Sequence, residues 1–537
     1  MDYGRPVYGK VADEDPIVVT KSGPVRGIAR DGIAVFRGIP YGADCTGRNR
    51  FRRAQEVHPW EEVLDCTRNG AIAIQLGDAG NGIHDYFTAG KPENFGFERA
   101  NADNRILNVA GVTKGTGGNL QRENCLVANI LTPGIDDRKR AVVVYIHGGG
   151  FATGSGTLTF GADDFAKEQD IVVCSLHHRL NAFGFLYLGD IDEEYKDSGI
   201  VGMLDLVLGL RWIHENIDRF GGDPDRITLM GESGGAMKIC TLLNMPISKG
   251  LYRSAIIESG SGKVGEDNRA AATAITRSIL KRLEIKENEL ERLNDIPADQ
   301  LMQAAEPYMM QFRPVPDGTC LQFQKEPKYA AEPMAYQIPI IVGSSEDEMA
   351  GMILGEGRPS VTEENLSAYA KKTLQDNTGK SYTDEEVQRV IRVCRKYSSN
   401  DAEQVYWFIS SFSSFLGGNA FFHAKERVTE GGAAVYSYLN ALDSPTPDGL
   451  LPESRRYSWH VSDLPLQFHI VLYKEFENVS ASLANAWGAF IRTQNPSTKE
   501  LEWPQYEKAE GRILLVDRKM EIIDDFRKEL AKAMKLC

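Results

Sequence analysis

The stretch Gly231-Glu232-Ser233-Gly234-Gly235 guides the interpretation of the rest of the chain. Residues 225–230 before it predict a short buried strand, and residues 236–243 after it predict the start of a helix. A turn this tight strains the residue at its apex, and glycines on both sides remove the clashes of neighbouring side chains. The pattern therefore favours a nucleophilic serine at a sheet edge. The alternative is a glycine-rich turn that holds a serine by chance, because short motifs recur.

The segments around this turn predict an α/β architecture. Residues 141–146 and 171–176 are apolar almost throughout, as in strands buried on both faces of a sheet. Residues 202–220 show helical spacing and stop at the breaker Gly221-Gly222-Asp223-Pro224. Strands and helices that alternate in this way predict a large, mostly parallel sheet with helices on both faces.

Composition narrows the function classes. The chain has 537 residues, of which 42% are hydrophobic and 25% charged, which suits one large α/β domain spanning residues 1–537 with long insertions. A net charge of -14 argues against a nucleic-acid partner. We see no apolar run of membrane-spanning length, no signal peptide and no paired cysteine spacing. These features predict a cytoplasmic protein with mostly reduced cysteines, and they leave its oligomeric state open.

A long segment at residues 77–121 is rich in glycine and asparagine, with scattered aromatic residues and little periodicity. A loop of this length inside a compact domain is usually either functional or disordered. We interpret it as a flap or gorge loop inserted over the active site.

A second glycine run, His147-Gly148-Gly149-Gly150-Phe151, follows the predicted strand 141–146. Glycines directly after a central strand leave backbone N–H groups free to point at one spot, as in an oxyanion hole. The alternative is a flexible glycine turn. We predict an oxyanion loop here.

A nucleophilic serine needs a base, and the base needs an orienting carboxylate. In α/β-hydrolases the chain order is serine, acid, histidine, which favours His460 in a late loop. His469 falls in an apolar run and is interpreted as core. Strand 338–343 leads to Glu346-Asp347-Glu348, at the edge where a catalytic acid belongs. Three consecutive acidic residues more often lie in a solvated loop. The periodicity of the sequence does not show which of the three is the catalytic acid.

Many ordered segments resemble the type B carboxylesterases, the carboxylesterase/cholinesterase family of α/β-hydrolases. Besides the serine motif, the resembling segments are Val25-Arg26-Gly27, Phe36-Arg37-Gly38-Ile39-Pro40-Tyr41, Glu123-Asn124-Cys125-Leu126, Arg179-Leu180, Phe220-Gly221-Gly222-Asp223-Pro224, Gly250-Leu251-Tyr252, Glu258-Ser259-Gly260-Ser261, Pro314-Val315-Pro316-Asp317-Gly318 and Trp487-Gly488-Ala489-Phe490. They cover nearly the whole chain, which is more specific than any single motif.

The resemblance implies the α/β-hydrolase fold and a Ser-Glu-His triad. It places the acid on Glu348, although Met349 replaces the usual glycine of the motif, so Glu346 stays an alternative. It places the histidine on His460, and Ser259 matches a hydroxyl expected to steady the acid and the histidine.

The resemblance also implies backbone oxyanion donors at Gly149, Gly150 and Gly234, where Gly234 replaces the usual alanine. In one departure from the family, Ala73 stands where the first disulfide cysteine is expected, which leaves Cys125 without its family partner.

We therefore expect a serine hydrolase that cleaves small-molecule carboxylic esters through an acyl-enzyme, with no metal and no organic cofactor. In the resembling family, the segment before Pro314 lines the acyl side of the site, which indicates Tyr308, Met310 and Phe312 as pocket residues. Gly351-Met352 stands where cholinesterases carry the aromatic residues that hold a quaternary ammonium group, so this cation–π site is not evident in the sequence. The alternatives are an acyltransferase or eliminating enzyme of a biosynthetic pathway with the same triad, or a non-catalytic interaction protein.

Overall fold

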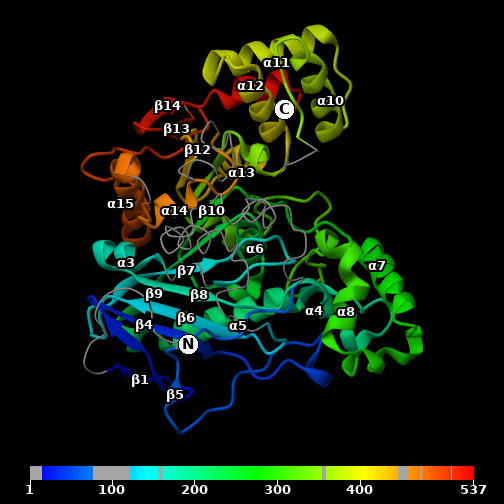
Figure 1. Cartoon of the computed structure of the whole chain (residues 1–537), viewed down its shortest axis with the longest axis vertical. Helices are drawn as coiled ribbons and strands as arrows, with labels where there is room; N and C mark the ends of the chain where they lie inside the picture. The colour runs from blue at the N-terminus through cyan, green and yellow to red at the C-terminus, as the bar shows by residue number, and fades with distance from the viewer. Residues whose placement is uncertain are drawn as a thin grey trace, which may run out of the picture.

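The described part of the chain contains a large sheet with its covering helices and a small sheet of three strands, β1 (Ile17–Val19), β2 (Pro24–Arg26) and β5 (Leu64–Asp65) (Figure 1). The structure, a computed structural model, describes residues 15–75, 121–156, 161–352, 358–444, 457–471, 474–509 and 511–537. The predicted flap at residues 77–121 lies outside these ranges, except for Gln121.

The main sheet has eleven strands, and its middle is parallel. In spatial order the strands are β14 (Glu521–Asp524), β13 (Arg512–Val516), β12 (Val435–Asn440), β11 (Ile340–Ser345), β10 (Ser254–Glu258), β9 (Gly222–Glu232), β7 (Arg140–Ile146), β8 (Val172–Leu176), β6 (Val127–Thr132), β4 (Ile33–Pro40) and β3 (Ile28–Arg30). The strands from β13 to β8 pair in parallel, whereas the outer pairs are antiparallel. The carboxyl ends of the central strands therefore meet at one edge of the sheet.

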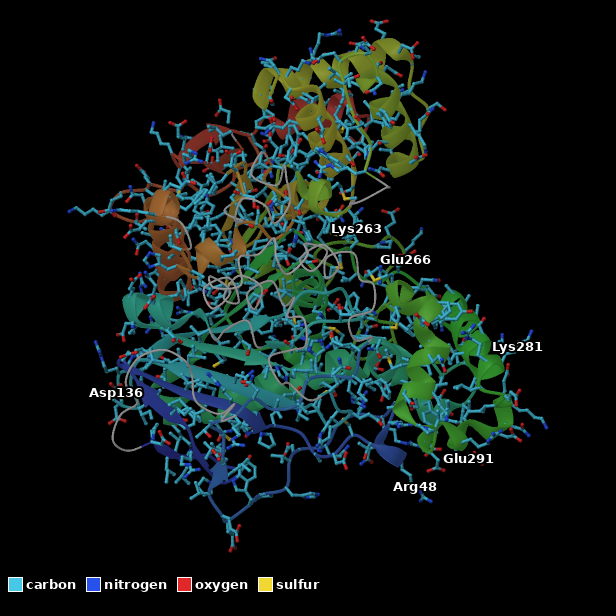
Figure 2. All side chains as sticks on the ribbon, in the orientation of Figure 1. Arg48, Asp136, Lys263, Glu266, Lys281 and Glu291 are labelled. Atoms are coloured by element: carbon cyan, nitrogen blue, oxygen red, sulfur yellow. The ribbon has the colours of Figure 1, made fainter. Side chains whose placement is uncertain are left out.

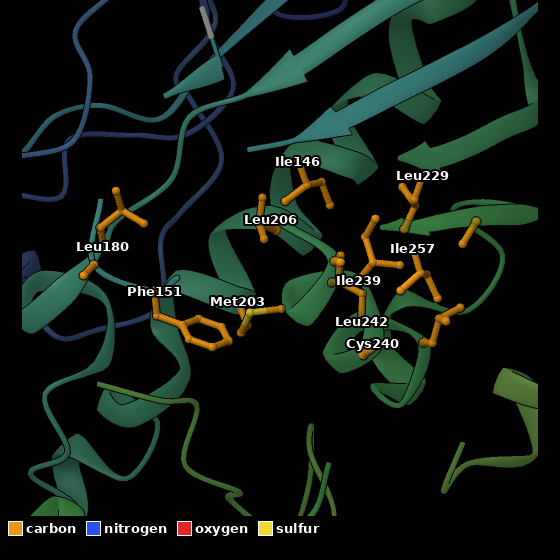
Figure 3. Packing of buried hydrophobic residues seen from close by; sticks show 14 of the residues in the cluster. Ile146, Phe151, Leu180, Met203, Leu206, Leu229, Ile239, Cys240, Leu242 and Ile257 are labelled. Atoms are coloured by element: carbon orange, nitrogen blue, oxygen red, sulfur yellow. The ribbon is translucent and has the colours of Figure 1, made fainter. Parts of the chain in front are cut away.

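Helices cover both faces of this sheet, as the sequence predicted. On one side, Val142, Val144 and Ile146 of β7 join the larger core, which includes α5 (Val201–Asn216), α6 (Gly234–Leu243) and α13 (Gly418–Glu430). The alternate residues of β7 pack with α3 (Asp163–Gln169) and α15 (Glu477–Thr493) on the other side. Figure 3 shows Ile146, Leu229 and Ile257 of the sheet in the larger core, with Leu206 and Ile239 from its helices. The strands are apolar on both faces because both faces are covered.

Other helices form two groups beside the sheet, seen at the right and the top of Figure 1. The first group contains α4 (Asn181–Phe185), α7 (Arg269–Arg282) and α8 (Ala298–Ala305). The second contains α10 (Leu366–Thr378), α11 (Asp384–Tyr397), α12 (Ala402–Ser413) and α16 (Arg527–Ala533). Within the described ranges, no helix is long and apolar enough to cross a bilayer.

The predicted elements around Ser233 match the structure with small shifts. Helix α6 begins at Gly234, two residues before the predicted start. The predicted helix 202–220 is α5 followed by a 3-10 turn, which ends where Gly221 adopts a φ of 79°. All eight cysteines are free thiols, and burial raises the pKa of Cys125.

Candidate active site

Ser233 occupies a strained turn between β9 and α6. Its backbone angles are φ 56° and ψ -123°, a region that side-chain-bearing residues rarely adopt. The Ser233 N–H donates to the carbonyl oxygen of Glu258 on the neighbouring strand at 2.8 Å. The turn is thereby attached to the sheet, and the half-buried serine is presented at the carboxyl edge of the strands.

Glycines make this turn possible, as the sequence predicted. A Cβ on Gly235 would lie 2.0 Å from the carbonyl oxygen of Ile146, and one on Gly231 would lie 2.7 Å from the Gly235 carbonyl carbon. A Cβ on Gly260 would lie 2.0 Å from the Ser233 carbonyl oxygen. Helix α6 therefore packs against β7 and the loop after β10 more closely than any side chain permits.

The structure brings Ser233, His460 and Glu348 together. The Nε2 atom of His460 lies 2.9 Å from the Ser233 hydroxyl, and its Nδ1 atom lies 2.5 Å from a carboxylate oxygen of Glu348. His460 and Glu348 are 1% and 0% exposed, so water does not compete for these bonds. With the proton on Nδ1, the imidazole donates to Glu348 and leaves Nε2 free to accept the serine proton.

Glu348 is the first residue of a 3-10 turn three positions after β11. The Ser345 N–H donates to its second carboxylate oxygen at 2.7 Å, which orients the carboxylate toward His460. The backbone N–H of Glu346, the alternative acid, donates to the carbonyl oxygen of Asn440. The carboxylate of Asp347 accepts hydrogen bonds from the backbone N–H and the hydroxyl of Ser458. All three acids are buried, so the solvated-loop alternative is wrong.

His469 is not a core residue, contrary to the sequence-based interpretation. Its side chain is 18% exposed, and its Nδ1 atom lies 2.6 Å from the carboxylate of Glu168. The apolar run around it packs into the smaller core, but His469 itself has a φ of 53° and turns toward α3.

Glu232 also lies in the site, and it is not among the residues predicted from the sequence. Its carboxylate oxygen Oε1 lies 3.2 Å from Nε2 of His460, and its side chain is only 4% exposed. Burial raises the pKa of Glu232 to about 8. For His460, burial lowers the pKa, but the carboxylates of Glu232 and Glu348 outweigh burial and raise it. The sequence signal that could have identified Glu232 is its position directly before Ser233 in the G-x-S-x-G motif.

The predicted oxyanion loop, His147 to Phe151, lies against the turn that holds Ser233. Gly149 and Gly150 have φ values of 83° and 62°, which favour glycine. A Cβ on Gly234 would lie 2.2 Å from the Gly150 nitrogen. The loop and the first turn of α6 are thus in close backbone contact, which brings the three predicted donors into one region.

Ser259 is buried and follows β10 with a φ of 50°. Its N–H donates to the carbonyl oxygen of Gly343 on β11 at 2.9 Å. Within the described ranges, no hydrogen bond joins its hydroxyl to Glu348 or His460, so the predicted supporting role stays a prediction.

The predicted pocket residues differ in burial. Phe312 is buried and borders a cavity of about 140 Å³, which Phe185 also lines; the Phe185 ring lies 5.1 Å from that of Phe151 in the oxyanion loop. Tyr308 is half-buried, and Met310 is 60% exposed.

A separate open cleft of about 810 Å³ contains none of the predicted site residues. Figure 2 labels two of its lining residues, Arg48 and Glu291, at the lower right edge of the molecule. In the described part of the chain, no group of three or more His, Cys, Asp or Glu side chains could hold a metal ion.

Comparison with known proteins identifies the family. The model of the carboxylesterase family matches residues 14–534. A para-nitrobenzyl esterase of Bacillus subtilis (strain 168) is 29% identical over 95% of this chain and 96% of its own length. A phenmedipham hydrolase of Pseudarthrobacter oxydans is also 29% identical, over 95% of this chain and 97% of its own.

Solved structures agree with this assignment. A PNB esterase superimposes with a TM-score of 0.75 at 27% identity, over 97% of this chain and 99% of its own. A carboxylesterase from Geobacillus stearothermophilus gives 0.75 at 29% identity, over 96% of this chain and 99% of its own. The chain therefore has the α/β-hydrolase fold and belongs to the carboxylesterase family, as a carboxylic ester hydrolase.

Proposed function

We propose that this protein cleaves carboxylic esters through an acyl-enzyme, with Ser233 as nucleophile, His460 as general base and acid, and Glu348 as the orienting carboxylate. The observation that carries this proposal is the continuous hydrogen-bonded chain from Ser233 Oγ through the His460 ring to Glu348, with distances of 2.9 and 2.5 Å. This hydrogen-bonded chain starts at Ser233, whose backbone is strained, and strained residues are found mainly at functional sites.

In the proposed reaction, Ser233 Oγ bonds to the ester carbonyl carbon while its proton passes to Nε2 of His460. The tetrahedral intermediate collapses, the C–O bond to the alcohol breaks, and Nε2 returns the proton to the leaving alkoxide. Water then attacks the acyl-enzyme by the same route and releases the acid. Glu348 accepts the hydrogen bond from Nδ1 throughout and stabilises the imidazolium formed in each half-reaction.

The backbone N–H groups of Gly149, Gly150 and Gly234 stabilise the oxyanion of both intermediates in this proposal. Removal of one such donor in other hydrolases costs about 10²–10³ in kcat. The close contact of Gly234 with Gly150 supports a shared site for the three donors.

We propose that the substrates are small-molecule esters. We also propose that residues 1–537 form a single large domain. Two relatives are named for a para-nitrobenzyl ester and for phenmedipham, so a para-nitrobenzyl ester is the first substrate to test. We place the acyl group near Tyr308, Met310 and Phe312, because Phe312 borders a cavity linked to the oxyanion loop through Phe185.

The test is covalent labelling with a fluorophosphonate probe, followed by mass spectrometry. We expect one adduct, on Ser233, together with loss of hydrolysis of a para-nitrobenzyl ester; Ser233→Ala should prevent both labelling and turnover. Ser248→Ala, a buried serine outside the site, serves as the control. An adduct on another serine, or full turnover by Ser233→Ala, contradicts the proposal. Product analysis with water and added alcohols then distinguishes hydrolysis from acyl transfer.

A further inference from the structure

A fully buried lysine lies beneath the oxyanion loop. Lys238 is the fifth residue after Ser233, on α6, and is 0% exposed. Its amine donates to the carbonyl oxygen of His147 at 3.0 Å. Within the described ranges, no carboxylate lies at ion-pair distance from this amine, and burial alone lowers the pKa of Lys238 to about 7. A buried amine without an acidic partner costs folding free energy, so its presence calls for a functional reason.

The bonded carbonyl belongs to the first residue of the oxyanion loop. The His147 ring is 2% exposed and stacks on His178, with ring centres 4.7 Å apart. A Cβ on Gly154 would lie 2.3 Å from its Nδ1 atom, so the ring occupies the space that a side chain at position 154 would need. Burial lowers the pKa of both histidines, and the amine of Lys238 lowers them further. Lys238 therefore meets only neutral groups and a backbone carbonyl at this end of the loop.

The other end of the loop rests on the same face of the helix. Gly234 and Lys238 are four residues apart, so they lie one above the other along α6. A Cβ on Gly234 would lie 2.2 Å from the nitrogen of Gly150 and 2.4 Å from its Cα. Helix α6 thus contacts the loop at two places. The amine of Lys238 binds the start of the loop, and the backbone of Gly234 packs directly against Gly150 at the other end.

We propose that Lys238 is a positioning residue that fixes the oxyanion loop: its amine holds the His147 carbonyl, while Gly234 leaves the space into which Gly150 docks. The inference rests on the proposed function of the loop and goes beyond it, because it assigns the placement of the donors to two residues of α6. A chain with alanine at position 234 has to hold this loop farther from the helix.

This role affects the transition state more than substrate binding. The donors act on the charge that develops on the carbonyl oxygen, so a displaced loop lowers kcat and leaves KM nearly unchanged. A trifluoromethyl ketone, which forms an oxyanion adduct with the serine, probes the loop directly. Its affinity should fall by the same factor as kcat/KM.

The central variant is Lys238→Met, which keeps the side-chain volume and removes the donor. We expect kcat to fall by about 10–100-fold, less than the loss of a whole donor. The KM should change by less than threefold, and the Tm should not fall, because a buried amine is removed. Lys238→Gln retains an N–H donor and should recover part of the loss. Lys249→Met, at an exposed lysine soon after α6, is the matched control and should behave as the unaltered protein.

A double-mutant cycle tests the shared role. Gly234→Ala should lower kcat as well, because its Cβ pushes Gly150 away. Combining it with Lys238→Met should cost less than the product of the two single losses. The inference is overturned by unchanged kcat and ketone affinity in Lys238→Met, by a loss that tracks a lower Tm without recovery by glutamine, or by multiplicative losses in the double variant. Probe labelling of Ser233 in the unaltered protein decides the proposed function separately.

Discussion

Replacement of Glu232 by glutamine should shift the pH dependence of catalysis. In the proposed mechanism His460 has to be neutral to accept the serine proton, and a nearby carboxylate stabilises its charged form. Glu232→Gln removes the negative charge 3.2 Å from Nε2 and keeps the size of the side chain. The pKa of His460 should therefore fall, and the acid limb of the kcat/KM profile should move to lower pH.

The distance sets the size of the shift. Two unit charges 3.2 Å apart interact by about 5 kcal/mol at an effective dielectric constant of about 20, equivalent to roughly 4 pKa units. Burial raises the pKa of Glu232 itself to about 8, so near pH 7 it is ionised in only a minor fraction of molecules. We therefore expect a shift of about 1–2 pH units, since the two groups titrate as a coupled pair.

The assay is kcat/KM for a para-nitrobenzyl ester between pH 5 and 10, because this ratio reports the pKa values of the free enzyme. Glu258→Gln is the matched control. Glu258 pairs with Glu232 in the sheet register and is also buried, and glutamine retains an acceptor for the Trp487 N–H. An acid limb that stays in place, or that moves to higher pH, in Glu232→Gln refutes the reasoning.

Three further predictions concern the base, the pocket and the packing of the turn. His460→Ala should lower kcat by several orders of magnitude without loss of folding, whereas His469→Ala should change both kcat and Tm little, because it removes a partly exposed hydrogen bond to Glu168; inactivation by the second variant alone would show that the base is misassigned. Met310→Ala should shift the kcat/KM ratio toward longer acyl chains, by roughly 1–3 kcal/mol; an unchanged ratio across an ester panel excludes Met310 from the pocket. Gly235→Ala should lower the free energy of unfolding by about 1–3 kcal/mol or more in a denaturant titration, because its Cβ would lie 2.0 Å from a β7 carbonyl oxygen. Gly262→Ala, whose Cβ would have its nearest neighbour 3.9 Å away, is the control, and equal stability of the two variants would contradict the packing argument.

The sequence by itself determined the features that depend on neighbouring residues. The strand, the turn and the helix around Ser233 follow from glycines at fixed places beside an apolar segment, because steric clashes in a tight turn are local. The glycine run after residues 141–146 is local in the same sense. A parallel sheet with two covered faces follows from continuous apolar strands, since such strands cannot face water.

Only the tertiary structure decided which side chains meet. The spacing of apolar residues does not distinguish Glu346 from Glu348. The 3-10 turn after β11 directs Glu348 toward His460. The contact of Glu232 with His460 and that of Lys238 with His147 join segments about 230 and 90 residues apart. No local pattern encodes such contacts, because they arise when parallel strands bring their carboxyl ends to one edge and bury charged groups there, and burial then sets their pKa values.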